Sequence, residues 1–112
     1  GDGLGCNNCG VVYRDGIGTK KSRKRSAAFF EKSCSLGHKP GCTNAGYMYD
    51  KGHGVLQDNI TAHMWFNIAG ANSSEYGVTN RNGLAENMTP ADISEAQRRA
   101  RVCMNSNYQD CD

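Results

Sequence analysis

The sequence predicts an all-α fold in which about three helix pairs, each an αα-hairpin, stack as a repeat solenoid stapled by disulfides. Three observations carry this prediction. The stretch GVVYRDGIGT, residues 10–19, returns 36 residues later as GYMYDKGHGV, residues 46–55. Apolar and small residues recur at helical spacing on both sides of each copy. The chain of 112 residues also contains six cysteines, which can stabilise a core that is too small to hold alone.

The first helix of each repeat leads into the repeated motif. Residues at i, i+3, i+4 and i+7 form one helical stripe in each copy: Cys42, Ala45, Gly46 and Tyr49 in the second, and Cys6, Cys9, Gly10 and Tyr13 in the first. The Gly-x-Gly that follows supplies positive φ and ends the helix, so we expect Gly52 or Gly54 in the left-handed region. A phosphate-binding loop is disfavoured, because such loops follow a strand.

A second helix follows each glycine loop. Its apolar stripe is Ala62, Trp65, Phe66 and Ala69 in the second copy, and Ser26, Phe29, Phe30 and Ser33 at the same offsets in the first. These aromatic pairs are expected in the core between helices. Repeat 1 is therefore predicted over about residues 4–36 and repeat 2 over about 40–71.

The last part of the chain, about residues 73–112, is predicted to be a capping helix pair that completes a single domain over 1–112. A helix is expected over about 73–88, with Gly77, Leu84, Ala85 and Met88 on one side. Thr89 is a good N-cap for the next helix, with Pro90 at its first position and Asp92 at the capping-box position. Its stripe is Ile93, Ala96, Ala100 and Cys103, and its other side is charged.

The composition limits the classes of function that the chain can have. The net charge is +2, too small to require a nucleic acid as partner. No apolar run approaches the ~18 residues of a membrane span. An even number of cysteines favours disulfides and an oxidising compartment. Zinc is disfavoured, because only Cys6-x-x-Cys9 has ligand spacing and no second pair follows. We expect neither metal nor cofactor.

The stretch GYMYDKGHGVLQDNITAHMWFNIAGA resembles the Sel-one-like repeat (SLR), a relative of the tetratricopeptide repeat. The matching residues are Gly46, Tyr49, Gly52, Gly54, Val55, Asp58, Ala62, Trp65, Phe66 and Ala69. The first copy departs from the pattern at Thr19, Ser22 and Ser26. The resemblance implies a right-handed superhelix whose first helices line a concave face, and a scaffold that binds another protein or peptide.

The cysteines make the chain similar to the cysteine-rich SLR proteins of Helicobacter and related bacteria. That resemblance implies two disulfides, Cys34–Cys42 and Cys103–Cys111, each closing the turn after a second helix. Cys6 aligns with Cys42, and its equivalent partner would lie before residue 1. Cys6 is therefore free, bridged to Cys9, or paired outside this chain. A structural Cys6–Cys9 bridge is favoured over a redox site, although it needs a loose first turn.

No catalytic motif accompanies these repeats. The sequence lacks Ser-x-x-Lys, Lys-Thr-Gly, Gly-x-Ser-x-Gly and His-Glu-x-x-His, which carry nucleophile or metal chemistry. His38, His53 and His63 are expected at the surface or rim. We predict a non-catalytic adaptor of an exported bacterial protein, secreted or periplasmic. The alternative, implied by relatives described in this way, is a penicillin-binding or weak β-lactamase-type hydrolase.

Two surfaces are candidates for partner contacts. On the first helices, the residues off the buried stripe are Asn7, Asn8, Val11 and Val12, and Thr43, Asn44, Tyr47 and Met48, of which the exposed subset is expected to bind. The basic run Lys20, Lys21, Arg23, Lys24 and Arg25 is either a solvated loop or a site for an acidic protein, an anionic lipid or nucleic acid. The solvated loop is the favoured interpretation, with an acidic protein as the candidate partner at these residues.

Overall fold

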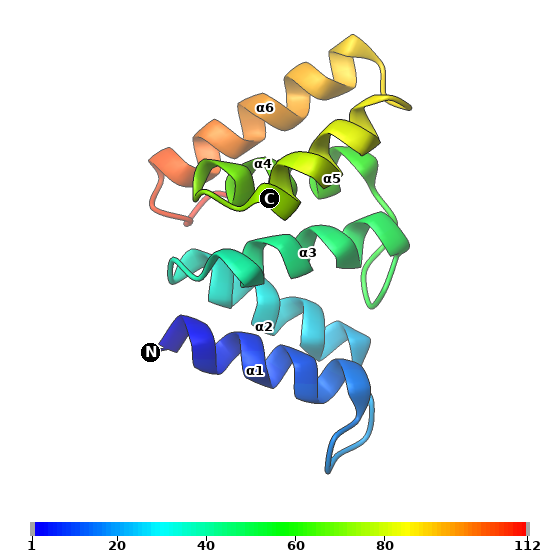
Figure 1. Cartoon of the computed structure of the whole chain (residues 1–112), viewed down its shortest axis with the longest axis vertical. Helices are drawn as coiled ribbons and strands as arrows, with labels where there is room; N and C mark the ends of the chain where they lie inside the picture. The colour runs from blue at the N-terminus through cyan, green and yellow to red at the C-terminus, as the bar shows by residue number, and fades with distance from the viewer. Residues whose placement is uncertain (1, 112) are drawn as a thin grey trace.

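The computed structural model describes residues 2–111, and its secondary structure consists of six helices (Figure 1). They are α1 (Asp2–Asp15), α2 (Arg23–Ser35), α3 (Lys39–Lys51), α4 (Asn59–Ala71), α5 (Glu75–Ala85) and α6 (Pro90–Asn105). Consecutive helices pair as antiparallel hairpins that stack along the long axis of a body measuring 43 × 25 × 24 Å. The predicted all-α repeat solenoid with three helix pairs is confirmed.

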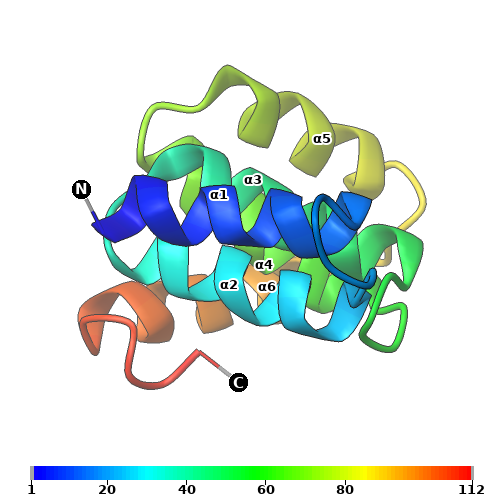
Figure 2. The same cartoon turned by 90° about the horizontal axis from the view of Figure 1, so that it is seen from below.

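The hairpins form two layers. Seen along the stack, α1, α3 and α5 lie on one side, and α2, α4 and α6 lie on the other (Figure 2). Within the stack α2 packs on α3, and α4 packs on both α5 and α6. Each repeat therefore covers the apolar stripe of the next, as the repeat pattern predicts.

Side chains at the helix starts satisfy the first backbone N–H groups. Asp58 accepts hydrogen bonds from the backbone N–H of Ile60 and Thr61. Ser22, at the equivalent position of the first repeat, accepts from Arg25 N–H at 3.2 Å, so it replaces the aspartate of the family pattern in the same role. The predicted N-cap Thr89 accepts from Asp92 N–H at 3.1 Å, which confirms the predicted start of α6.

The helix predicted over 73–88 is shorter than expected. It begins after its N-cap Ser74 and ends at Ala85. The N–H groups of Asn87 and Met88 bond to carbonyls only three residues earlier, so the chain tightens into a turn there. Because Thr89 caps the next helix, little room remains for a longer α5.

The glycines of the repeated motif have positive φ in both copies. Gly16 and Gly18 have φ values of 70° and 72°, and Gly52 and Gly54 have values of 68° and 81°. The left-handed conformation turns the chain back after α1 and α3, as predicted. A Cβ on Gly54 would also overlap the backbone of Arg23, so this position excludes larger residues on two grounds.

The core contains the predicted second-helix residues except Phe29, which is half-buried and stacks on Tyr13 with ring centroids 5.6 Å apart. Phe30 and Phe66 are fully buried, as are Ala62 and Ala69. In the first repeat Ser26 and Ser33 replace these alanines, and both hydroxyls donate across to α1 carbonyls, Ser26 to Gly10 at 2.7 Å and Ser33 to Gly3 at 2.6 Å. The first-copy stripe was wrong at Cys9, which is exposed; Gly3 is buried instead.

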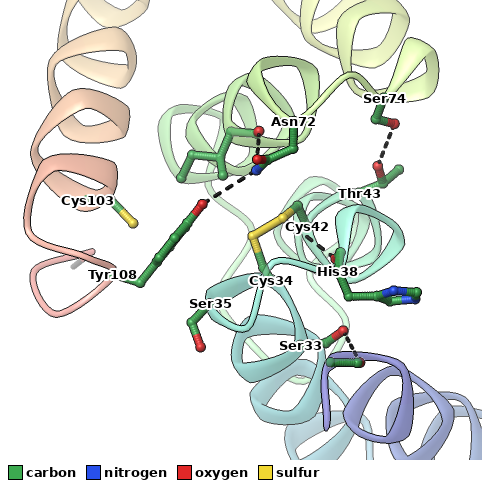
Figure 3. Close-up of a disulfide and its surroundings, with 12 residues drawn as sticks. Ser33, Cys34, Ser35, His38, Cys42, Thr43, Asn72, Ser74, Cys103 and Tyr108 are labelled. Atoms are coloured by element: carbon green, nitrogen blue, oxygen red, sulfur yellow. Dashed lines mark hydrogen bonds between the residues drawn. A yellow bond between two sulfur atoms is a disulfide. The ribbon is translucent and has the colours of Figure 1, made fainter. Parts of the chain in front are cut away.

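Both disulfides implied by the family resemblance are present. Cys34–Cys42 joins the end of α2 to the first turn of α3, with a Cα–Cα distance of 4.5 Å (Figure 3). Cys103–Cys111 closes the turn after α6, with a Cα–Cα distance of 4.3 Å. Each bridge constrains a short loop and so stabilises the fold by reducing the freedom of the unfolded chain.

The favoured Cys6–Cys9 bridge is wrong for this structure, in which both thiols are free. The helix begins at Asp2, so both cysteines lie in regular α-helix rather than in a loose first turn. Side chains at i and i+3 are then about 5–6 Å apart at Cβ, beyond the ~3.5–4.5 Å that a disulfide needs.

Candidate functional site: a groove on the first-helix layer

A groove of about 630 Å³ lies where the first turns of α3 and α5 face each other. The turn between α4 and α5 closes one side. The lining residues come from both helices and this turn: Lys39, Pro40, Thr43, Asn44, Tyr47, Ser73, Ser74, Glu75 and Tyr76. Two aromatic rings and several hydroxyl and amide groups therefore share one concave surface, a composition typical of binding sites.

The two tyrosines present most of the apolar surface. Tyr76 is 75% exposed and Tyr47 is 37% exposed. The Tyr47 ring packs edge-on against the buried ring of Phe66, with centroids 5.4 Å apart. Its hydroxyl accepts a hydrogen bond from Asn80 Nδ2 at 3.0 Å. Tyr47 is thus held in place, and Tyr76 is free to contact a ligand.

The floor of the groove is a buried pair of hydroxyls. The Thr43 and Ser74 oxygens lie 3.2 Å apart and share a hydrogen bond that links α3 to the start of α5 (Figure 3). Ser74 also caps α5 by accepting from Gly77 N–H at 3.2 Å. These contacts fix the width of the groove, because they join its two walls.

The 36-residue period continues across the face of the first helices. Leu4, Pro40 and Tyr76 occupy equivalent positions in α1, α3 and α5, and all three are exposed. A second row of equivalent positions is Asn8, Asn44 and Asn80. The groove is therefore one section of an apolar row and an amide row that cross the helices side by side.

Two members of the amide row, Asn44 and Asn80, link neighbouring first helices. Asn44 Nδ2 donates to Asn7 Oδ1 at 3.0 Å, between α3 and α1. Asn80 Nδ2 donates to the Tyr47 hydroxyl, between α5 and α3. An amide side chain has further donor and acceptor capacity, so these side chains can also bond to the backbone of an extended ligand.

The structure brings some of the predicted partner-binding residues into the groove and not others. Asn44 and Tyr47 line it, whereas Asn8 is exposed on α1 and Asn7, Val11 and Val12 are half-buried there. Thr43 lies in the buried floor, and Met48 is in the core. Neither residue therefore belongs to the exposed subset that was expected to bind, because α3 is covered by neighbours on more than one side.

Sequence reasoning missed six lining residues: Lys39, Pro40, Ser73, Ser74, Glu75 and Tyr76. The 36-residue period makes Glu75 and Tyr76 the equivalents of Lys39 and Pro40, so the repeat alone relates the two walls of the groove. The helical stripe gives no such signal, because these residues lie at the helix starts and in the turn before α5.

One histidine of the second-helix layer is buried. His63 was expected at the surface or rim, and this is wrong: it is 2% exposed in α4. Burial, assisted by the charge of Arg81, lowers the pKa of His63 below its ordinary value, which favours the neutral form.

Within residues 2–111, no three metal-ligating side chains come together as a metal site requires. None of the helices described has the length and apolar character needed to cross a membrane.

A stack of αα-hairpins with a groove across its first helices defines an α-solenoid repeat protein. The Sel1 repeat model matches residues 3–38 and 40–74. The chain belongs to the Sel1 repeat family.

Related proteins come from two kinds of organism. Cytochrome c oxidase assembly factor 7 of Xenopus tropicalis and factor 7A of Xenopus laevis are each 40% identical over 65 residues, 57% of this chain and 28% of theirs. The crystal structure of c5321, a protective antigen of uropathogenic Escherichia coli strains with an SLR fold, superposes with a TM-score of 0.88 at 24% identity. That match covers 96% of this chain and 24% of the antigen. The chain thus spans about a quarter of the length of these relatives.

Proposed function

We propose that the chain is a non-catalytic adaptor whose groove binds an extended segment of a partner protein. The observation that carries this proposal is the pair of rows across the first helices, one apolar and one of amides, which meet at the groove between Tyr47 and Tyr76. An extended peptide running across the helices would place side chains on the apolar row and backbone amides on the asparagines. Such an arrangement gives affinity through aromatic anchors.

The compartment is part of the proposal. Two disulfides in a chain of this size support an oxidising location, secreted or periplasmic in a bacterium. The likeness to oxidase assembly factors is compatible with an adaptor, because assembly requires contact with other proteins.

The test begins with a random peptide library selected against the oxidised, folded chain. Affinity of the selected peptides is then measured for Tyr76→Ala and Tyr47→Ala, with Leu36→Ala as the matched control, since Leu36 is exposed outside the groove. We expect a loss of about tenfold or more at Tyr76 and no change at Leu36. Met48→Ala is unsuitable as a probe, because Met48 is buried.

Two results would contradict the adaptor proposal. Equal affinity of the groove variants and the wild type would place binding elsewhere on the molecule. Turnover of a chromogenic cephalosporin by the folded chain would instead support the hydrolase alternative, so this assay accompanies the binding measurement.

A further inference from the structure

The loops that follow α1 and α3 form one continuous surface on the side of the molecule away from the first turn of α3. Both loops, residues 16–22 and 52–58, project from the same side of the stack, one above the other (Figures 1 and 2). They touch, because a Cβ on Gly54 would overlap the backbone of Arg23 and Lys24. The groove residues Lys39 and Pro40 lie at the opposite end of α3.

This surface holds a cluster of positive charge that is compensated only in part, by the attraction between Lys21 and Asp15. Five exposed cations lie in the first loop and the start of α2: Lys20, Lys21, Arg23, Lys24 and Arg25. Arg25 stacks over the Tyr13 ring at 5.6 Å, and nearby Asp15 is paired with Arg14 at 3.0 Å. Among the residues described, the remaining four cations take part in no ion pair.

The charge is also placed against the helix dipole. The first turn of α2 lacks an acidic residue, as do those of α3 and α4, but it alone consists of three cations, Arg23, Lys24 and Arg25, although the positive end of a helix favours anions and disfavours cations. In contrast, α6 follows the rule with Asp92 in its first turn. Cations at the positive end of a helix, with no acidic residue in the same turn, are a departure from helix electrostatics that indicates a functional surface. The ligand that would relieve this repulsion is an anion.

Two aliphatic side chains project beside these cations. Leu56 is 89% exposed and Ile17 is 60% exposed, the highest values for large aliphatic side chains in the described part of the chain. Both loops are held by backbone hydrogen bonds, Ile17 N–H to Val12 at 3.0 Å and Asp58 N–H to Tyr49 at 3.1 Å. The aliphatic tips are therefore presented by ordered loops.

We propose that this side of the molecule docks onto an anionic membrane surface. The cations contact lipid phosphates and carboxylates, and Ile17 and Leu56 enter the boundary between headgroups and acyl chains. Aliphatic tips within a basic cluster fit a bilayer better than an acidic protein, because peripheral binding combines apolar insertion with attraction to anionic lipids. The groove, at the other end of α3, stays accessible.

The experiment measures sedimentation of the oxidised chain with vesicles of phosphatidylcholine alone and with about a third phosphatidylglycerol. We expect binding to the anionic vesicles only. The triple variant Lys20→Ser, Lys21→Ser, Lys24→Ser should lower the partition coefficient by roughly tenfold to a hundredfold. Leu56→Ser and Ile17→Ser should each lower it by roughly several-fold. Leu36→Ser and Arg101→Ser, both exposed away from this surface, are matched controls that should bind as the wild type does.

Insertion has its own readout. Leu56→Trp should be quenched by brominated lipid, whereas the wild type should not, because its single tryptophan, Trp65, is buried. Failure of the wild type to bind anionic vesicles would overturn the proposal. So would loss of binding in the lysine variant with unchanged binding in Leu56→Ser and Ile17→Ser, since charge alone then acts and an acidic protein becomes the better partner. Circular dichroism and melting establish that each variant is folded.

Discussion

The ring of Phe66 lies against Gly46, in the space that a Cβ at that position would occupy. Phe30 has the same relationship to Gly10, 36 residues earlier. Each hairpin is thus closed by a second-helix phenylalanine packed onto a first-helix glycine. This contact explains why the repeat motif begins with glycine in both copies.

Adding a methyl group at this contact should destabilise the fold. In Gly46→Ala the new Cβ would lie 2.5 Å from Cδ1 and Cε1 of Phe66, and overpacking of this kind costs about 1–3 kcal/mol. The matched control is Gly83→Ala in α5, where no atom lies within 4 Å of the new Cβ; it should stabilise by up to about 1 kcal/mol. Urea unfolding measures both, and effects of the same sign would contradict the packing argument.

Removal of the Cys34–Cys42 bridge should lower stability without changing the helices. For a loop of this length we expect the double variant Cys34→Ala, Cys42→Ala to lose about 2–3 kcal/mol of unfolding free energy. Cys9→Ala serves as a control, because Cys9 is exposed and free. Non-reducing peptide mapping of the wild type should recover the Cys34–Cys42 and Cys103–Cys111 pairs, and a different pairing would refute the assignment.

The turn between α4 and α5 should accept a third disulfide. Gly70 and Val78 lie 36 residues after Cys34 and Cys42, and a Cβ on Gly70 would be 3.0 Å from Val78 Cγ2. The double variant Gly70→Cys, Val78→Cys should oxidise and gain about 2 kcal/mol over its reduced form. Peptide mapping and thermal melting check this, with each single variant as control. Two free thiols in the oxidised protein would show that the two turns differ in geometry.

Stability at low pH should depend on Glu95. Hydrogen bonds from Arg98 and Arg99 lower the pKa of this carboxyl to about 2 from its ordinary 4.5. Because the folded pKa is the lower one, the stabilisation is fully present above 4.5 and is lost as the pH falls toward 2. Glu95→Gln should therefore have a lower Tm than the wild type near neutral pH, and the difference should vanish near pH 2. Because these ion pairs are accessible to solvent, added salt should also reduce the difference in Tm between the variant and the wild type. A Tm difference that does not change with pH would show that it does not come from the charge of Glu95.

Much of the fold follows from the sequence because the period and the helical stripe act together. The offset of 36 residues aligns Gly10 with Gly46 and Phe30 with Phe66, and these contacts form as the pattern predicts. The residue types at single positions also predicted two local features correctly: the N-cap at Thr89 and the positive φ of Gly52 and Gly54. These features depend on residues close in sequence or on exact repetition.

The candidate site was predicted less completely, because a helical stripe identifies one buried face. Thr43 and Met48 lie off that stripe but are buried, since α3 packs against α2 and α4 and also meets α1 and α5. Ser73 shows a second limit: it adopts φ 72° at the position equivalent to Gly37. A non-glycine residue carries no sequence signal for that conformation, so the shape of the groove edge required the structure.

The central place of α4 in the stack also sets how the molecule opens. This helix packs against α3, α5 and α6, and its buried residues include Trp65, Phe66 and Ile68. The first helix, α1, in contrast, buries only Gly3 and Gly10. Amide hydrogens of α1 should exchange with solvent through local opening of this helix, while those of α4 should exchange only when the whole chain unfolds. Stability is thus graded along the stack, so that α1 can open while α2, bridged to α3 by the Cys34–Cys42 disulfide, and the centre of the stack remain closed.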